Sequence, residues 1–503
     1  MPDGMDNGRE RGATHYFNTR STSCPNSKAG AANSVISISD TSDIDDGDGD
    51  VIVISSDDAS DSQSEAEDIL PVTGKQGRLS ATPLLSYPHG TVRITHLQDE
   101  RSASDDMITF EALVQPEKLR KAILSAYVVD MEWLTGKFRP ETKIVLVENY
   151  NPKTEHRGAM QFDRGMLTIV HPEFNPRQMY PIVHSKFMLL FYDTHVRLVV
   201  GSANLIPVDW SIIQNILFIQ DLPYTPNRPQ PTTEFGISLT EVLLDLSVPS
   251  RAVAQLDYVD FRKVTVHLVA SVPTSYRRSI DHSTHYGISR LAQVVHKMKP
   301  HMPAVDNASL SLYVYGTSMS AITEQYLTVF YKCAQGPDPQ SLNSMTRWYM
   351  DKSAVRVYIG FHTEDQAQEF RYEDQSRSSL VFMRSMYTNH SFPRDRLHKI
   401  RASAPRVATH AKVIMARLGR AQDHGWVYLG SHNFTQGAWG RPKDTSRPNI
   451  NNYELGVVIP DISYSVEAGH TYAMWNGARV PLSFDVDWEP YSYQDIPCLR
   501  DNV

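Results

Sequence analysis

The sequence predicts a mixed α/β protein made of two similar halves that follow an acidic tail. Strand and helix patterns alternate from about residue 85, which is typical of layered α/β sheets. A short polar motif at a strand end occurs twice, about two hundred residues apart, which indicates an internal duplication. We therefore expect a disordered tail at 1–80, a first half at 81–245 and a second half at 246–503.

The tail is acidic and poor in aromatic residues. Residues 1–70 carry 15 Asp and Glu against 4 Lys and Arg, which leaves residues 71–503 with a net charge of +3. Such a tail buries too little apolar surface to fold alone. Four consecutive β-formers precede Ser and acidic residues: Val51, Ile52, Val53 and Ile54. This segment, and a weaker copy at 35–38, suits addition to a sheet edge and resembles a SUMO-interacting motif; the alternative is an incidental apolar cluster.

The overall composition is that of an ordinary globular protein, with 41% hydrophobic and 21% charged residues. No run of about 18 apolar residues occurs and the first ten residues hold no apolar signal core, so we expect neither a membrane span nor a secretory signal. Cys24, Cys333 and Cys498 stand too far apart for a zinc pattern or a disulfide framework, which favours a reducing compartment. A mildly basic body is compatible with nucleic acid.

Local patterns predict the elements of the first half. Residues 109–138 have a mostly helical pattern, whereas 143–149 and 166–172 are typical of strands. The apolar run that ends at Tyr192 predicts a strand buried on both faces. His184 and Lys186 stand two apart at its start, so both point to one face. Taken alone, such a pair is more often a solvated rim of the core.

The same order of residues is repeated in the second half. After His184 and Lys186, a strand ends in Gly-Ser and is followed by Asn204, 20 residues beyond the His. His410 and Lys412 likewise precede a strand that ends in Gly-Ser, and Asn433 follows 23 residues beyond the His. Recurrence in one strand-and-turn context indicates a function for both sets, because chance repeats of a single element would not share that context.

Two such sets suit the displacement of a group on phosphorus. Lys and Asn side chains can donate hydrogen bonds to non-bridging phosphate oxygens. One imidazole can attack, while the other protonates the leaving oxygen and later activates water. These segments show no metal-ligand spacing, so we expect a phosphodiester substrate, no metal and no cofactor.

The duplicated H-x-K…N pattern resembles the phospholipase D superfamily, with one departure. The Asp that usually follows the Lys after four residues is replaced by Phe191 and Arg417. That version is similar to the tyrosyl-DNA phosphodiesterase family, as are "SANLIPVDW", "SHNFTQGAWG" and "NYELGVVIP", over roughly 85–495. The resemblance implies two α/β/α-sandwich halves with the active site at their interface.

The resemblance also implies a function. It implies a monomeric, nuclear DNA-repair hydrolase that cleaves the bond between a topoisomerase I tyrosine and a DNA 3′ end, and that trims other 3′ adducts. Its partners would be DNA with a 3′ adduct, at a single-stranded, nicked or blunt end, and a topoisomerase I peptide. The alternatives are another phospholipase D-type enzyme that acts on lipid or plain nucleic acid, and an inactive adaptor that binds SUMO and DNA.

Residue roles follow from the matched motifs. His184 would be the nucleophile and His410 the general acid and then base, with Lys186, Lys412, Asn204 and Asn433 around the phosphate. Glu454 would be the carboxylate partner of His410, and Asn215 stands where the family has the amide partner of His184. Secondary expectations concern substrate contacts: Tyr180 stacking on a base, hydroxyls in the pocket from Ser431 and Thr435, and DNA phosphates held by Thr317, Ser318 and Ser320. The last three residues also fit a plain strand-to-helix cap. Trp210 and Trp439 are expected in the core.

Overall fold

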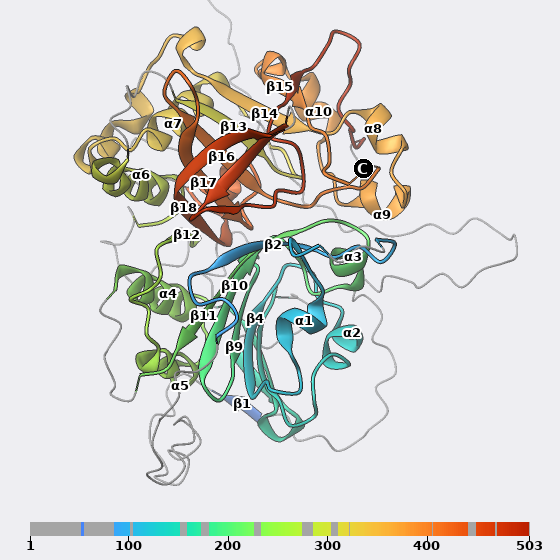
Figure 1. Ribbon diagram of the computed structural model, residues 1–503, viewed down its shortest axis with the longest axis vertical. Coiled ribbons are helices and arrows are strands. Elements are labelled where there is room, and N and C mark those ends of the chain that lie inside the picture. The colour runs from blue at the N-terminus through green and yellow to red at the C-terminus, as the bar shows by residue number, and fades with distance from the viewer. Residues whose placement is uncertain are drawn as a thin grey trace, which may run out of the picture. The chain divides into compact units, whose positions relative to one another are not determined.

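Two mixed β-sheets form the framework of the chain, and Figure 1 shows one above the other. The computed structural model describes residues 52–54, 85–100, 104–150, 158–172, 181–225, 233–273, 285–302, 310–320, 322–404, 406–440, 449–467 and 470–501. Gly49–Arg500 forms one compact unit. The predictions for the tail, including 35–38 and Val51, lie outside the described residues, apart from the backbone of Ile52–Ile54.

The first sheet is built from residues 52–223. In spatial order its strands are β1 (Ile52–Ile54), β6 (Gly158–Phe162), β7 (Leu167–His171), β5 (Lys143–Val147), β4 (Lys121–Ser125), β9 (Phe187–Phe191), β10 (His195–Gly201), β11 (Ile216–Pro223), β2 (Thr91–Thr95) and β3 (Met107–Ile108). The hairpin of β9 and β10 lies at its centre, and both strands are almost entirely buried. Strand β1 pairs antiparallel with β6 at one edge.

The second sheet repeats the central hairpin. Its strands, in spatial order, are β20 (Ala478–Arg479), β19 (His470–Trp475), β18 (Asn452–Glu467), β17 (His424–Gly430), β16 (Val413–Leu418), β13 (Ser311–Tyr315), β14 (Val357–Phe361), β15 (Leu397–Lys399) and β21 (Glu489–Pro490). Two further strands pair with β18: β12 (His267–Ser271) runs antiparallel and β8 (Ile182–Val183) runs parallel. Strand β8 belongs in sequence to the first half, so it links the two sheets.

Helices cover the sheets. They are α1 (Phe110–Val114), α2 (Met131–Thr135), α3 (Pro207–Ser211), α4 (Glu234–Asp245), α5 (Ser250–Val253), α6 (Gly287–Met298), α7 (Glu324–Ala334), α8 (Glu364–Gln368), α9 (Glu373–Ser378), α10 (Arg384–Thr388) and α11 (Gln436–Trp439). Apolar residues of α1, α2 and α3 pack on the first sheet, and those of α6 and α7 pack on the second. A third core joins β10 and β11 to β16, β17 and β18, and it makes the two sheets one folded body. The predicted α/β class is confirmed.

The prediction of a mostly helical segment at 109–138 was wrong in its middle. Helix α1 ends at Gln115, whose φ of 45° is left-handed, and Pro116 follows. Residues Lys121–Ser125 then form strand β4 between β5 and β9, with Ala122 and Leu124 fully buried. A short apolar run buried on both faces looks the same in sequence whether it is helix or strand.

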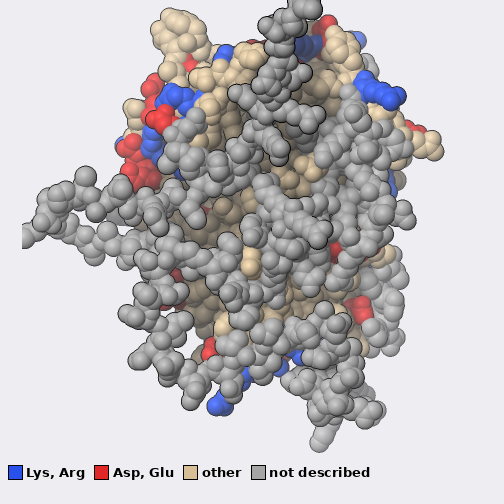
Figure 2. Space-filling model, turned by 180° about the vertical axis from the view of Figure 1, so that it is seen from behind, with Lys and Arg blue, Asp and Glu red and all other residues tan. Residues whose placement is uncertain are grey.

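Lys and Arg side chains lie beside Asp and Glu side chains at the upper left of the face in Figure 2, so positive and negative charges are mixed there.

No helix in the described part of the chain is long and apolar enough to cross a membrane.

Candidate active site

The two central hairpins end in the same turn. The Gly201 N–H donates to the carbonyl of Lys186 at 3.1 Å, and the Gly430 N–H donates to that of Lys412 at 3.3 Å. Glycine is required at both places because neighbouring strands approach closely: an added Cβ would lie 2.4 Å from the Ile216 carbonyl oxygen at Gly201, and 2.4 Å from another Cα at Gly430. Each turn is followed by the Asn of its own set, Asn204 or Asn433.

Each histidine segment is also anchored to the other half of the chain. The His184 N–H donates to the carbonyl of Tyr453 at 2.9 Å, next to the pairing of β8 with β18. The His410 N–H donates to the carbonyl of Gln214 at 2.7 Å. The residue after each of these acceptors, Glu454 or Asn215, is therefore the one placed beside the imidazole.

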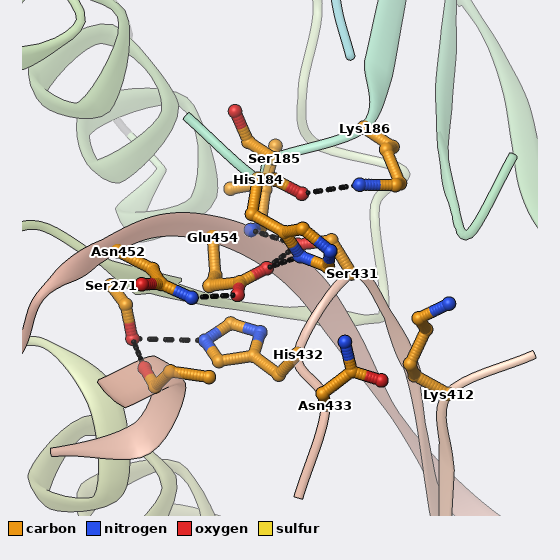
Figure 3. A network of polar contacts seen from close by, with 12 residues as sticks. His184, Ser185, Lys186, Ser271, Lys412, Ser431, His432, Asn433, Asn452 and Glu454 are labelled. Atoms are coloured by element: carbon orange, nitrogen blue, oxygen red, sulfur yellow. Dashed lines mark hydrogen bonds and ion pairs between the residues drawn. The ribbon is translucent and has the colours of Figure 1, made fainter. Parts of the chain in front are cut away.

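Glu454 lies against His184, so its expected contact with His410 was wrong. The Nδ1 nitrogen of His184 is 2.8 Å from Oε2 of Glu454, which is itself buried. Ser431 donates its hydroxyl to the same oxygen at 2.5 Å, and the Asn452 amide donates to Oε1 at 3.0 Å (Figure 3). Burial opposes ionisation of Glu454, but His184 outweighs it and holds the pKa of the carboxyl at about 2. The carboxylate fixes the proton of His184 on Nδ1 and leaves Nε2 as a lone pair.

Asn215 lies against His410, so its expected contact with His184 was also wrong. Its Oδ1 is 3.1 Å from the Nδ1 nitrogen of His410. A carboxyl oxygen of Asp209 lies 3.3 Å from the same nitrogen. Burial lowers the pKa of His410 to about 4, helped by the charge of Lys412 and partly offset by Asp209. The free protein therefore holds His410 neutral near pH 7.

Both lysine side chains are buried, and the charge of Lys186 acts on Lys412. Each ammonium donates to the carbonyl of the His two residues before it, at 2.9 Å for Lys186 and 2.6 Å for Lys412. Burial lowers the pKa of Lys186 to about 8. Burial, and then the charge of Lys186, lowers the pKa of Lys412 well below its usual value. Two cations enclosed together with little solvent are arranged to receive an anion.

The side-chain oxygens of the two asparagines are both held by main-chain donors. Oδ1 of Asn204 accepts the Val128 N–H at 3.2 Å, and Oδ1 of Asn433 accepts the Ser318 N–H at 3.1 Å. Because each oxygen is occupied by a backbone donor, each Nδ2 remains to donate. Figure 3 shows Lys412 and Asn433 on one side of the site and His184 and Lys186 on the other.

The hydroxyls have several positions. The Ser431 hydroxyl donates to Glu454, and the hydroxyl of Thr317 lies 3.5 Å from Asn433 Oδ1. The Ser320 hydroxyl accepts the Gln436 N–H. Thr435 is the N-cap of α11. Trp210 and Trp439 are buried in apolar clusters. The predicted base-stacking residue, Tyr180, lies outside the described residues.

Two residues beside the histidines, Tyr127 and Asp209, were not predicted from the sequence. Tyr127 is 46% exposed, its ring lies 5.2 Å from that of His184, and the Lys186 ammonium lies over it at 5.6 Å. Asp209 stands within the matched stretch "SANLIPVDW", five residues after Asn204, but the second copy has Ala438 at the corresponding place, so the repeat gave no signal for it. In the described part of the chain, His, Cys, Asp and Glu form no cluster of three or more that could hold a metal ion.

Two His-Lys-Asn sets that face one buried space, each at the end of a central hairpin, define a phosphodiesterase of the phospholipase D type. The profile described as Tyrosyl-DNA phosphodiesterase matches residues 90–492. The chain belongs to the tyrosyl-DNA phosphodiesterase family, DNA-repair hydrolases that cleave the phosphodiester between tyrosine and DNA. The family and the activity that the sequence predicts are thus confirmed.

Individual relatives agree. Tyrosyl-DNA phosphodiesterase 1 of Drosophila melanogaster is 23% identical over 471 residues, which cover 86% of this chain and 77% of that protein. Its Arabidopsis thaliana namesake is 31% identical over 167 residues, or 30% of this chain and 27% of that one. The crystal structure of the yeast tyrosyl-DNA phosphodiesterase superposes with a TM-score of 0.58 at 18% identity, and covers 81% of this chain and 99% of that one. That likeness shows the fold.

Proposed function

We propose that this enzyme acts at DNA 3′ ends through a covalent phosphohistidine on His184. The observation that carries the proposal is the exchange of partners between the halves of the chain. Each Nδ1 is held by an acceptor from the other half of the chain, which leaves both Nε2 atoms for chemistry beside the same lysine pair. Two imidazoles that each keep Nε2 for proton transfer or attack are what a two-step displacement on one phosphorus needs.

In the first step, Nε2 of His184 attacks the phosphorus and the bond to the tyrosine oxygen breaks. His410 gives its Nε2 proton to that oxygen, so tyrosine leaves as a neutral phenol. The negative charge of the bound phosphodiester favours the protonated form of His410, which therefore takes up its proton as the substrate binds. The lysines and the two amide nitrogens stabilise the five-coordinate phosphorus.

In the second step, water attacks the same phosphorus on the face that tyrosine has left. His410, now neutral, accepts a proton from this water, and the bond from phosphorus to His184 breaks. The products are a DNA 3′-phosphate and a free enzyme. Glu454 stabilises the positive ring of the phosphorylated His184 through the Nδ1–H.

The leaving group of the first step indicates which substrates fit. A tyrosine carried by a topoisomerase I peptide is the fitting adduct, and other 3′ adducts with an alcohol or phenol oxygen would be trimmed by the same steps. The DNA end would be single-stranded, nicked or blunt, the enzyme monomeric and its location nuclear. Family membership, together with both His-Lys-Asn sets intact, favours this proposal over a lipid substrate or an inactive adaptor.

The test uses a 3′-phosphotyrosyl oligonucleotide in the presence of EDTA. The parent protein should release tyrosine, because every step uses protein side chains and water. His410→Asn should accumulate enzyme joined to the oligonucleotide, and His184→Ala should form no adduct. An adduct on His184→Ala but not on His410→Asn would reverse the roles, and strict dependence on Mg²⁺ would exclude this mechanism.

A separate part of the proposal concerns the tail. We propose that 51–54 bind SUMO by strand addition. Support comes from the backbone of Ile52–Ile54, which forms a strand that pairs antiparallel with β6 at the edge of the first sheet. Titration of full-length protein with SUMO should give saturable binding, and replacement of Ile52 and Ile54 by Ala should abolish it. Equal binding by both proteins would exclude this role.

A further inference from the structure

Asp209 is a buried carboxylate that the steps above do not use. It lies in the first turn of α3 and is 2% exposed. One carboxyl oxygen accepts the Asn204 N–H at 2.6 Å and lies 3.3 Å from Nδ1 of His410. It thus contacts an asparagine from the first sheet and a histidine from the second.

The neighbouring amide fixes what His410 presents to this oxygen. Nδ2 of Asn215 donates to the main-chain carbonyl of Asp209 at 2.9 Å, and its Oδ1 accepts the Ser202 hydroxyl at 2.8 Å. Oδ1 is therefore the atom 3.1 Å from His410 Nδ1. Both protein atoms that face Nδ1 are acceptors, so Nδ1 carries hydrogen and Nε2 is the atom that exchanges the catalytic proton.

The Asn215 amide fixes the tautomer of His410 but leaves the charge of its protonated form without a partner. An amide oxygen selects the tautomer, but it does not compensate the charge of an imidazolium. Lys412 and Lys186 both disfavour that charge. Asp209 favours it, and its own carboxyl has a lowered pKa because His410, the Asn204 N–H and Lys412 outweigh the cost of burial.

We propose that Asp209 is the charge partner of His410, the counterpart of Glu454 at His184, and that it positions and stabilises the imidazolium that protonates the leaving group. The assignment rests on the proposed roles of the two histidines. The alternative is a purely structural role, in which the Asp209 carboxylate only holds the turn by accepting the main-chain N–H of Asn204. The two readings differ in what happens when the leaving group no longer needs a proton.

The experiment compares two oligonucleotides in single-turnover reactions, one with a 3′-phosphotyrosyl group and one with a 3′-(4-nitrophenyl phosphate) group. Nitrophenolate leaves without a proton, whereas tyrosine needs one. Asp209→Asn should slow tyrosine release on the order of 10-fold or more, while nitrophenolate release stays within about 3-fold of the parent. Asp130→Asn is the matched control: Asp130 accepts the Trp133 N–H at the start of α2, and both rates should be unchanged.

The pH profile gives a second measurement. Loss of the Asp209 charge lowers the pKa of His410, so the limb of tyrosine release that reports protonated His410 should move to lower pH in Asp209→Asn. Lys186 and Lys412 face His410 in both proteins, so their contribution is common to the two profiles. Equal slowing of both substrates with an unmoved limb would overturn the proposal in favour of the structural reading.

A charge-relocation variant covers the case in which Asp209→Asn folds poorly. Asp209→Asn combined with Asn215→Asp returns one carboxylate to the side of His410 Nδ1. The proposal expects the preference for tyrosine over nitrophenolate to recover in this double variant, and no recovery overturns it. His410→Asn distinguishes a failure of the proposed function from a failure of the role given to Asp209. If His410→Asn also slows both substrates equally, the proposed role of His410 fails. If it is selective while Asp209→Asn is not, only the present inference fails.

Discussion

The Nδ1 nitrogen of His184 lies 2.8 Å from Oε2 of Glu454, although 270 positions separate the two residues and they come from different halves of the chain. The contact exists because β8, just before His184, pairs in parallel with the start of β18. It fixes the proton of His184 on the nitrogen that faces away from the site. The first histidine therefore depends on the second half of the chain for its reactivity.

Replacement of Glu454 tests this dependence. Glu454→Gln keeps the size of the side chain and removes its charge, so the positive ring of phosphorylated His184 loses its partner. We expect tyrosine release to fall on the order of 10²-fold or more. Steady-state rates with the 3′-phosphotyrosyl oligonucleotide measure it, and Glu489→Gln, on the exposed strand β21, is the control. A rate within about 3-fold of the parent would show that His184 needs no carboxylate.

The sequence predicted which residues form the two sets better than it predicted their partners. The repeated His-Lys-Asn order is local, and in each hairpin it is held by the same hydrogen bond from Gly201 or Gly430. The partners depend on long-range pairing: Glu454 is near His410 in sequence, yet β18 delivers it to His184. Strand β4 was missed for a related reason, because its burial between β5 and β9 is tertiary and leaves no distinct periodicity.

Binding of an anion should draw protons into the site. Burial lowers the pKa of Lys186 to about 8 and also lowers that of Lys412 well below its usual value, and a bound oxyanion favours both ammonium forms. Affinity for inorganic phosphate should therefore weaken as the pH rises above about 8. Calorimetry in two buffers of different ionisation enthalpy should show net proton uptake at pH 8.

The control for this measurement is a surface lysine. Lys399→Gln removes a charge from a partly exposed strand on the second sheet and should leave the uptake unchanged. Lys186→Met should reduce it. Phosphate that bound without any proton uptake would mean that both lysines are already charged in the empty site.

Tyr127 should contribute to substrate binding more than to chemistry. Its ring is 46% exposed beside His184, where a base or the aromatic adduct can stack on it. Stacking of a base on an aromatic side chain contributes about 1–3 kcal/mol. Tyr127→Ala should therefore raise KM by about 5-fold or more with little change in kcat. Tyr349→Ala, at a tyrosine that is 80% exposed, should change neither constant, and a fall in kcat alone for Tyr127→Ala would contradict a binding role.

Ser318 should act through its backbone and not through its hydroxyl. Its N–H donates to Oδ1 of Asn433 and so turns Nδ2 of that amide toward the phosphate site. Ser318→Ala keeps the N–H and should retain activity close to that of the parent. Ser318→Pro removes the N–H, which frees the amide to rotate and withdraws one donor from the five-coordinate phosphorus, so kcat should fall on the order of 10²-fold. Thermal unfolding of both variants checks that the loop remains folded. If Ser318→Ala alone weakened oligonucleotide binding, the hydroxyl would instead contact the DNA, as the sequence had suggested.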